Sequence, residues 1–161
     1  MIRNTDYNRK MTWLLQQGKV EEFNDLRPPE KEMGREINLE RVNFSGSCLA
    51  KANLCGANLR FADFSDTTLK DTIFRDTDLF SANFKDAIMI NTDMVGARVD
   101  HVDFSAIKIF QGVNISGMCG LSFEQQEFLL DAIKQSWNWN NNPKHISQII
   151  AEIMKQRDFW G

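Results

Sequence analysis

Residues 52–66 read ANLCG ANLRF ADFSD, three units of five residues in which the third residue is always apolar. The pattern extends in both directions from Ile37 to Gln111, which gives fifteen units without a gap. The third residues are Leu39, Phe44, Leu49, Leu54, Leu59, Phe64, Leu69, Phe74, Leu79, Phe84, Met89, Met94, Val99, Phe104 and Ile109. A period of five is that of neither an α-helix nor a β-strand, so the pattern indicates a repeat architecture.

A chain that buries every fifth residue must turn once in each unit. We predict an all-β solenoid in which four units form a square turn of twenty residues and successive turns stack like strands of a parallel sheet. The third residue of each unit points to the axis, and the first residue, which is Ala, Ser or Thr in eleven units, lies inside near a corner. One side of this coil then carries only Phe, at positions 44, 64, 84 and 104, which favours four units per turn.

The second residue of each unit is Asn or Asp in nine cases. These are Asn38, Asn43, Asn53, Asn58, Asp63, Asp78, Asn83, Asp93 and Asp103. An array of this kind is compatible with metal binding or acid–base chemistry. We favour a structural role, because Asn and Asp side chains bond to nearby backbone N–H groups and support tight turns.

The units Ala52–Gly56, Ala57–Phe61 and Ala62–Asp66 match the pattern A-(D/N)-L-x-x, and the chain therefore resembles the pentapeptide repeat family. The resemblance implies a right-handed quadrilateral parallel β-helix, here of about four coils. Some family members resemble DNA and bind type II topoisomerases, many are bacterial proteins of unassigned role, and some are domains of secreted effectors. The resemblance thus implies a scaffold, and any site must be argued separately.

Helices are predicted at both ends of the solenoid. Residues 1–36 are expected to form an N-terminal helical cap, with Thr5 at the start of one helix and Gly18 at its end. The repeats occupy residues 37–121, with Gly112 as an inserted residue at a corner. Residues 122–161 are expected to form an αα-hairpin that begins at a capping box in Ser122–Gln125 and either caps the solenoid or forms a homodimer.

No catalytic, cofactor-binding or metal-binding residues are predicted. His101 stands near Asp100 and Asp103, but one His beside exposed carboxylates is typical of a solvated face. The three cysteines, at positions 48, 55 and 119, do not form a disulfide framework, which favours a reducing compartment, and the bacterial cytoplasm is the expected location. No apolar run is long enough to span a membrane. We therefore do not expect an enzyme.

Two features of the outer positions bear on binding. Apolar residues gather late in the coil at Ile73, Ile88, Ile90, Val95 and Phe110, which predicts either a partner surface or a surface covered by the terminal helices. A second group, Asp66, Asp71, Asp76 and Asp86, stands at the ends of units and predicts a short acidic edge.

The charge balance decides between two functions. Residues 37–121 carry ten acidic and eight basic residues, a net charge of −2, whereas duplex DNA carries about one negative charge per 1.7 Å. Close DNA mimicry is thus disfavoured, and direct binding of nucleic acid is not expected. The sequence favours a non-enzymatic scaffold that binds an unknown protein partner. The alternative is a DNA-mimicking binder or protector of type II topoisomerase (DNA gyrase).

Overall fold

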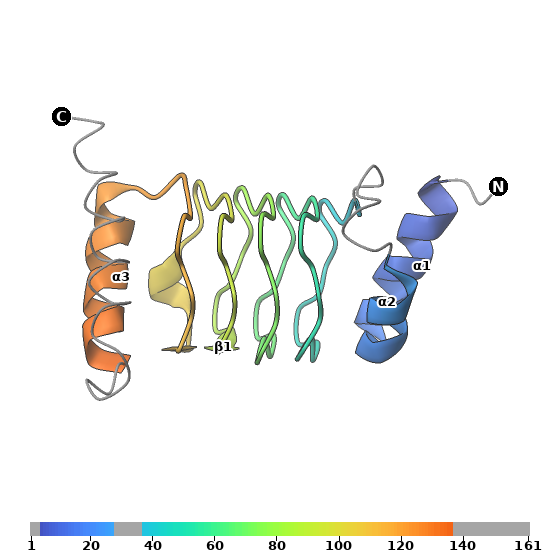
Figure 1. The fold of residues 1–161 in the computed structure, drawn as a ribbon, viewed down its shortest axis with the longest axis horizontal. Helices are drawn as coiled ribbons and strands as arrows, with labels where there is room; N and C mark the ends of the chain where they lie inside the picture. Colours follow the sequence, from blue (N-terminus) through green and yellow to red (C-terminus); the bar gives the residue numbers. More distant parts are fainter. Residues whose placement is uncertain (1–3, 28–36, 137–161) are drawn as a thin grey trace.

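The computed structural model describes residues 4–27 and 37–136, with side chains as far as residue 132. Its elements are two N-terminal helices, two short strands, a 3-10 turn and a third helix: α1 (Asn4–Gln16), α2 (Val20–Leu26), β1 (Ile88–Ile90), η2 (Phe104–Ala106), β2 (Ile109–Gln111) and α3 (Phe123–Ser136). Residues 37–121 wind in stacked turns (Figure 1). Helices α1 and α2 lie at one end of the stack and α3 at the other.

Parallel bridges pair residues that are twenty positions apart. One column of parallel bridges runs through Asn38, Asn58, Asp78 and Arg98, and three further columns start at Asn43, Cys48 and Asn53. Within a column, each unit both donates and accepts: Leu39 N–H donates to the Asn58 carbonyl at 2.8 Å, and Asn58 N–H donates to the Ile37 carbonyl at 3.0 Å. Four columns spaced five residues apart define the predicted four-sided turn of twenty residues.

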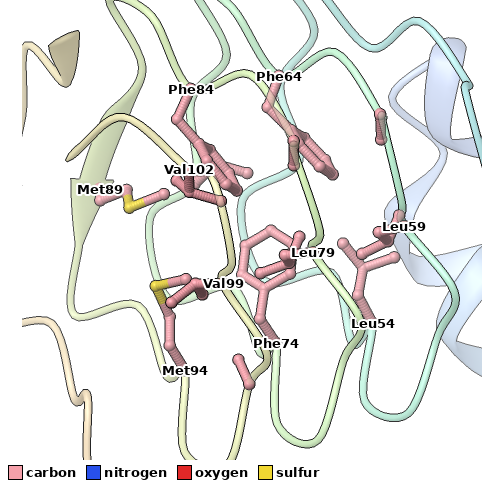
Figure 2. Packing of buried hydrophobic residues seen from close by; sticks show 14 of the residues in the cluster. Leu54, Leu59, Phe64, Phe74, Leu79, Phe84, Met89, Met94, Val99 and Val102 are labelled. Atoms are coloured by element: carbon pink, nitrogen blue, oxygen red, sulfur yellow. The ribbon is translucent and has the colours of Figure 1, made fainter. Parts of the chain in front are cut away.

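The third residues fill the inside of the coil. Phe64 and Phe84 stack with ring centroids 5.0 Å apart and planes inclined by 5°, and Phe44 stacks below Phe64 at 5.3 Å. Phe74, from another side, meets both Phe64 and Phe84 edge to face. Figure 2 shows the rings of Phe64, Phe74 and Phe84 among leucines and methionines of the interior. The predicted ladder of Phe residues is confirmed for positions 44, 64 and 84, which are all buried.

Small residues at the first position complete the interior. Ala52, Ala57 and Ala62 are buried, as are Thr67 and Thr72. The threonine hydroxyls donate to backbone carbonyls of the preceding turn, Thr67 to Phe44 at 3.0 Å and Thr72 to Leu49 at 2.9 Å. Their polarity is therefore satisfied without water, as a buried hydroxyl requires.

The corners explain the remaining sequence preferences. From Arg41 to His101, every fifth residue adopts a positive φ, between 53° and 69°. The nine second-position Asn and Asp residues each accept a hydrogen bond from the backbone N–H two residues on, for example Glu40 N–H to Asn38 Oδ1 at 3.0 Å. The prediction that these side chains support turns is confirmed.

The predicted register is wrong after Phe104. Up to that point bridged residues differ by twenty, but β1 and β2 pair Ile88 with Ile109 and Met89 with Phe110, a difference of twenty-one. The extra residue is taken up in η2, where Asp103 Oδ1 accepts the N–H of Ser105, and not at Gly112. Phe110 therefore takes the inward position expected for Ile109, which is 38% exposed.

Helices α1 and α2 contact the first turn through polar side chains. Gln16 donates to the Asn43 carbonyl at 2.9 Å, and Arg27 donates to the carbonyls of Asn53 and Cys55. Asn24 makes two such bonds, accepting from Asn53 N–H at 2.9 Å and donating to the Lys51 carbonyl at 3.0 Å.

The sequence signals at the ends of α1 were partly right. Gly18 ends the helix as predicted: its φ is +67°, its N–H donates to Leu15, and Lys19 N–H donates to Leu14. The helix begins at Asn4, however, so Thr5 lies within it.

Helix α3 begins with the predicted capping box. Ser122 N–H donates to Gln125 Oε1 at 2.6 Å, and Gln125 N–H donates back to Ser122 Oγ at 3.2 Å. Leu129 and Leu130 are buried, and α3 contacts η2 and β2 in the last turn. The second helix of the predicted hairpin lies outside the described residues.

Replacement of Phe64 by Ala tests the stacked core. Because Phe64 is fully buried between Phe44 and Phe84, we expect the free energy of unfolding to fall by about 3–5 kcal/mol, measured by urea denaturation. The matched control is Phe61→Ala on the outer surface, where the loss should be about 1 kcal/mol or less. Equal losses at the two positions would contradict the inward assignment.

Candidate functional site

The residues of the predicted partner surface do not lie together. Four of them lie on two sides of the coil, and the fifth, Phe110, packs against the core. Ile88 and Ile90 flank the buried Met89 in β1 and are half-buried on one side. Ile73 and Val95 lie on the next side, where Ile73 is bridged to Asn53 and Asp93, residues of the neighbouring turns.

Phe110 does not belong to the outer surface. Its ring packs against the core and meets Phe104 edge to face at 6.2 Å. Ile109 takes its place outside, directly above Ile88 in the parallel pairing. The apolar face therefore consists of Ile88, Ile90 and Ile109. The shifted unit that starts at Val113 indicated that a residue is inserted somewhere after Phe104, but not where.

The four predicted acidic residues do not form one edge. Asp66 and Asp86 are one turn apart at the same corner, whereas Asp71 and Asp76 belong to two other corners. All four have a φ between 53° and 58°. Asp and Asn are among the residues that tolerate this left-handed conformation best, so the backbone accounts for their placement.

Several other carboxylates are paired with arginines. Arg60 donates to Asp78 at 3.1 Å, and Arg75 donates to Asp93 at 2.5 Å. Arg98 donates to Asp100 at 2.8 Å and lies 3.7 Å from Asp78. The hydrogen bond and the attraction of Asp93 raise the pKa of Arg75, and those of Asp100 raise the pKa of Arg98. These pairs neutralise acidic charge on the sides of the coil.

A cluster that the sequence analysis did not identify lies on the side that starts at Asn38. We call it the arginine–phenylalanine stack, and it consists of Arg41, Arg60, Phe61, Phe80 and Arg98. The Arg41 guanidinium lies over the Phe61 ring at 5.2 Å, Arg60 lies over Phe80 at 4.4 Å, and Arg98 lies over Phe80 at 5.5 Å. The two rings meet edge to face at 5.5 Å.

The sequence did contain a signal for this stack. Arg41 and Phe61 are twenty residues apart, as are Arg60 and Phe80, so each pair occupies the same position in successive turns. Turns of a parallel sheet lie about 4.8 Å apart, which is within reach of a cation–π contact. The stack is therefore a consequence of the repeat period.

His101 and the three cysteines are the other residues that the sequence singled out for possible chemistry. His101 is exposed and meets the edge of Phe80 at 5.1 Å. The cysteines are free thiols, and partial burial followed by the charge of Asp100 raises the pKa of Cys119, which disfavours the nucleophilic thiolate. Within residues 4–27 and 37–136, no group of three or more His, Cys, Asp or Glu residues is placed to hold a metal ion.

The geometry defines a class of protein, a repeat solenoid whose outer sides present columns of side chains. Comparison with family models agrees: the model "Pentapeptide repeats (8 copies)" matches residues 37–76 and again 74–105. Residues 37–105 are therefore pentapeptide repeats, as the sequence pattern predicted, and no catalytic family is indicated. A comparison with curated proteins finds no match.

Three solved structures resemble parts of the chain, and the first and third are of pentapeptide repeat proteins. One is from Nostoc PCC 7120 (23% identity, TM-score 0.42, 52% of this chain and 64% of that chain). The second is QnrB1, a plasmid-mediated fluoroquinolone resistance protein (14% identity, TM-score 0.43, 50% of this chain and 45% of that chain). The third is from the thylakoid lumen of Arabidopsis thaliana (18% identity, TM-score 0.33, 68% of this chain and 86% of that chain). The chain thus covers less than two thirds of the first two proteins. No helix in the described part of the chain is long and apolar enough to cross a membrane.

Asp66 provides a test of the backbone origin of the acidic corners. At a φ of 55°, a β-branched side chain clashes with the backbone, so Asp66→Val should lower the free energy of unfolding by about 1–2 kcal/mol. Asp66→Gly should be neutral or stabilising, since glycine adopts this conformation without strain. Urea denaturation of both variants measures the difference, and equal stabilities would contradict the argument.

Proposed function

We propose that this protein is a non-enzymatic scaffold that binds a protein partner through the apolar face. The observation that supports this is the position of Ile88, Ile90 and Ile109 on one side of the coil. Ile88 and Ile90 are half-buried and Ile109 is 38% exposed. The core itself is filled by their neighbours Met89 and Phe110, so the fold does not require these three isoleucines to be apolar. Clustered apolar side chains on a surface are typical of interaction sites. Ile73 and Val95 extend the surface around the corner.

The scaffold in this proposal is a right-handed quadrilateral β-helix of about four coils with helical ends. Each helical end acts as a cap. In support, Asn24 and Arg27 satisfy backbone groups of the first turn, and Leu129 and Leu130 of α3 are buried within the same molecule. Burial of the apolar side of α3 favours capping over a homodimer through residues 122–161. The location we propose is the bacterial cytoplasm.

Binding to type II topoisomerase is the weaker proposal. DNA mimicry requires uncompensated acidic groups in a continuous row, and here Asp78, Asp93 and Asp100 are paired with arginines. The corner acids do not form such a row, because Asp66 and Asp86 share one corner while Asp71 and Asp76 belong to two others. Addition of the purified protein to a DNA gyrase supercoiling assay separates the proposals. We expect no inhibition and no protection against quinolones, and either effect at low concentration would reverse this order.

Replacement of Asn24 by Leu tests the N-terminal cap. The variant keeps the size of the side chain but loses two hydrogen bonds to the first turn, so the free energy of unfolding should fall by about 1–3 kcal/mol. Glu21→Leu on the same helix is the control, since Glu21 is exposed. Equal stability of the two variants in thermal and urea denaturation would show that Asn24 does not cap the coil.

The double variant Ile88→Lys, Ile109→Lys tests the apolar face. Affinity capture from lysate of the source cells should retain a protein partner on the wild type and lose it on the variant. Burial of a lysine charge weakens binding, and about 1.4 kcal/mol corresponds to a tenfold loss. Lys85→Gln, on another side, is the control and should bind as the wild type does. Retention of the same proteins by the double variant, with unchanged thermal stability, would exclude this face as the contact.

A further inference from the structure

We propose that the arginine–phenylalanine stack is a second docking surface, which binds a protein segment carrying a carboxylate next to an apolar or aromatic side chain. The proposal rests on the proposed protein-binding role, but it concerns a different side of the coil from Ile88, Ile90 and Ile109. Each surface can therefore fail its own test without the other.

The stack is ordered before any partner binds. Arg60 is held over Phe80 at 4.4 Å and over Phe61 at 5.6 Å, and its guanidinium is bonded to Asp78 at 3.1 Å. Arg98 is held in the same way by Phe80 and Asp100. Side chains that are already fixed lose little conformational entropy on binding, which favours affinity. Arginine and aromatic residues are also the ones that dominate the energy of protein interfaces.

The charges of the stack indicate what the partner must supply. Arg60 and Arg98 are each bonded to an acidic residue at 3.1 Å or less. Arg41 differs, because its side chain is 72% exposed and its ion pair with Glu40 spans 3.9 Å, near the limit of such a contact. Its guanidinium, placed over Phe61, can therefore bind a carboxylate in the bidentate geometry that arginine favours.

The apolar part of the partner would cover Phe61. This ring is 40% exposed and forms the centre of the stack, in contact with Arg41, Arg60 and Phe80. Removal of a partly exposed aromatic ring from water adds binding energy, and the arginines on either side exclude water from its rim. A carboxylate and an apolar side chain close together in one segment match this arrangement.

A protein segment fits this side of the coil better than nucleic acid does. The carboxylates of Asp78 and Asp100 lie among the arginines, 29% and 31% exposed, and would repel a phosphate backbone. The whole chain also carries a net charge of −3, which opposes accumulation of a polyanion.

Selection from a phage-displayed library of random linear peptides tests the proposal. We expect the wild-type protein to enrich peptides in which Asp or Glu stands beside an aromatic or large apolar residue. Their affinity should fall at least about tenfold for Phe61→Ala and for Arg41→Gln. Selection on Arg41→Glu should replace the acidic residue by Lys or Arg. Lys85→Gln and Ile88→Lys are controls that should bind the selected peptides as the wild type does.

Three results would contradict the proposed docking surface. The proposal is wrong if no such peptides are enriched, or if the selected peptides bind Arg41→Glu and the wild type equally. It is also wrong if single-stranded oligothymidylate binds to the wild type and is lost on Phe61→Ala. Thermal denaturation of each variant excludes unfolding as the cause. Failure of the capture experiment with the double variant Ile88→Lys, Ile109→Lys leaves this result unaffected.

Discussion

The structure depends on backbone hydrogen bonds between successive turns, in which bridged residues are twenty positions apart, and these bonds require a sharp corner in every unit of five residues. The corner forms because one residue in each unit adopts a left-handed conformation, from Arg41 to His101 without exception. A side chain there costs about 1–2 kcal/mol, except at Gly and, in part, at Asn and Asp. Burial of the third residue offsets the cost, and so does the Asn or Asp three residues earlier in the units that have one, because its Oδ1 accepts a backbone N–H just before the corner.

Much of this fold could be predicted, because its determinants are local and repeated. The spacing of Phe44, Phe64 and Phe84 indicated the number of units per turn, and Ser122–Gln125 indicated the start of α3. The error at Phe110 has a physical origin. After Phe104, apolar residues stand at positions 107, 109 and 110, so the apolar pattern is compatible with two registers, and the structure adopts the one in which η2 takes up an extra residue.

The candidate sites were harder to predict than the fold, since outer positions carry no periodic constraint. Ile88 and Ile90 could be assigned to the outside from the period alone, but Ile109 could not, because its assignment depends on the inserted residue. The arginine–phenylalanine stack requires a comparison of residues one turn apart, such as Arg60 with Phe80, and neither residue is unusual within its own unit. A surface of a solenoid is formed by residues that stack one turn apart, whereas the five-residue pattern relates only residues within one unit.

The corners also affect how the number of acidic residues in a repeat protein should be interpreted. Asp66, Asp71, Asp76 and Asp86 occupy positions where the backbone favours Asp, Asn or Gly, so their number reflects the fold before it reflects any partner. Asn91, which donates to Asp71 at 3.2 Å, occupies the equivalent position one turn later without a charge. A count of acidic residues therefore overestimates the resemblance to DNA. Charged residues that the corner conformation does not explain say more about a partner. On this chain, they are the arginines placed over Phe61 and Phe80.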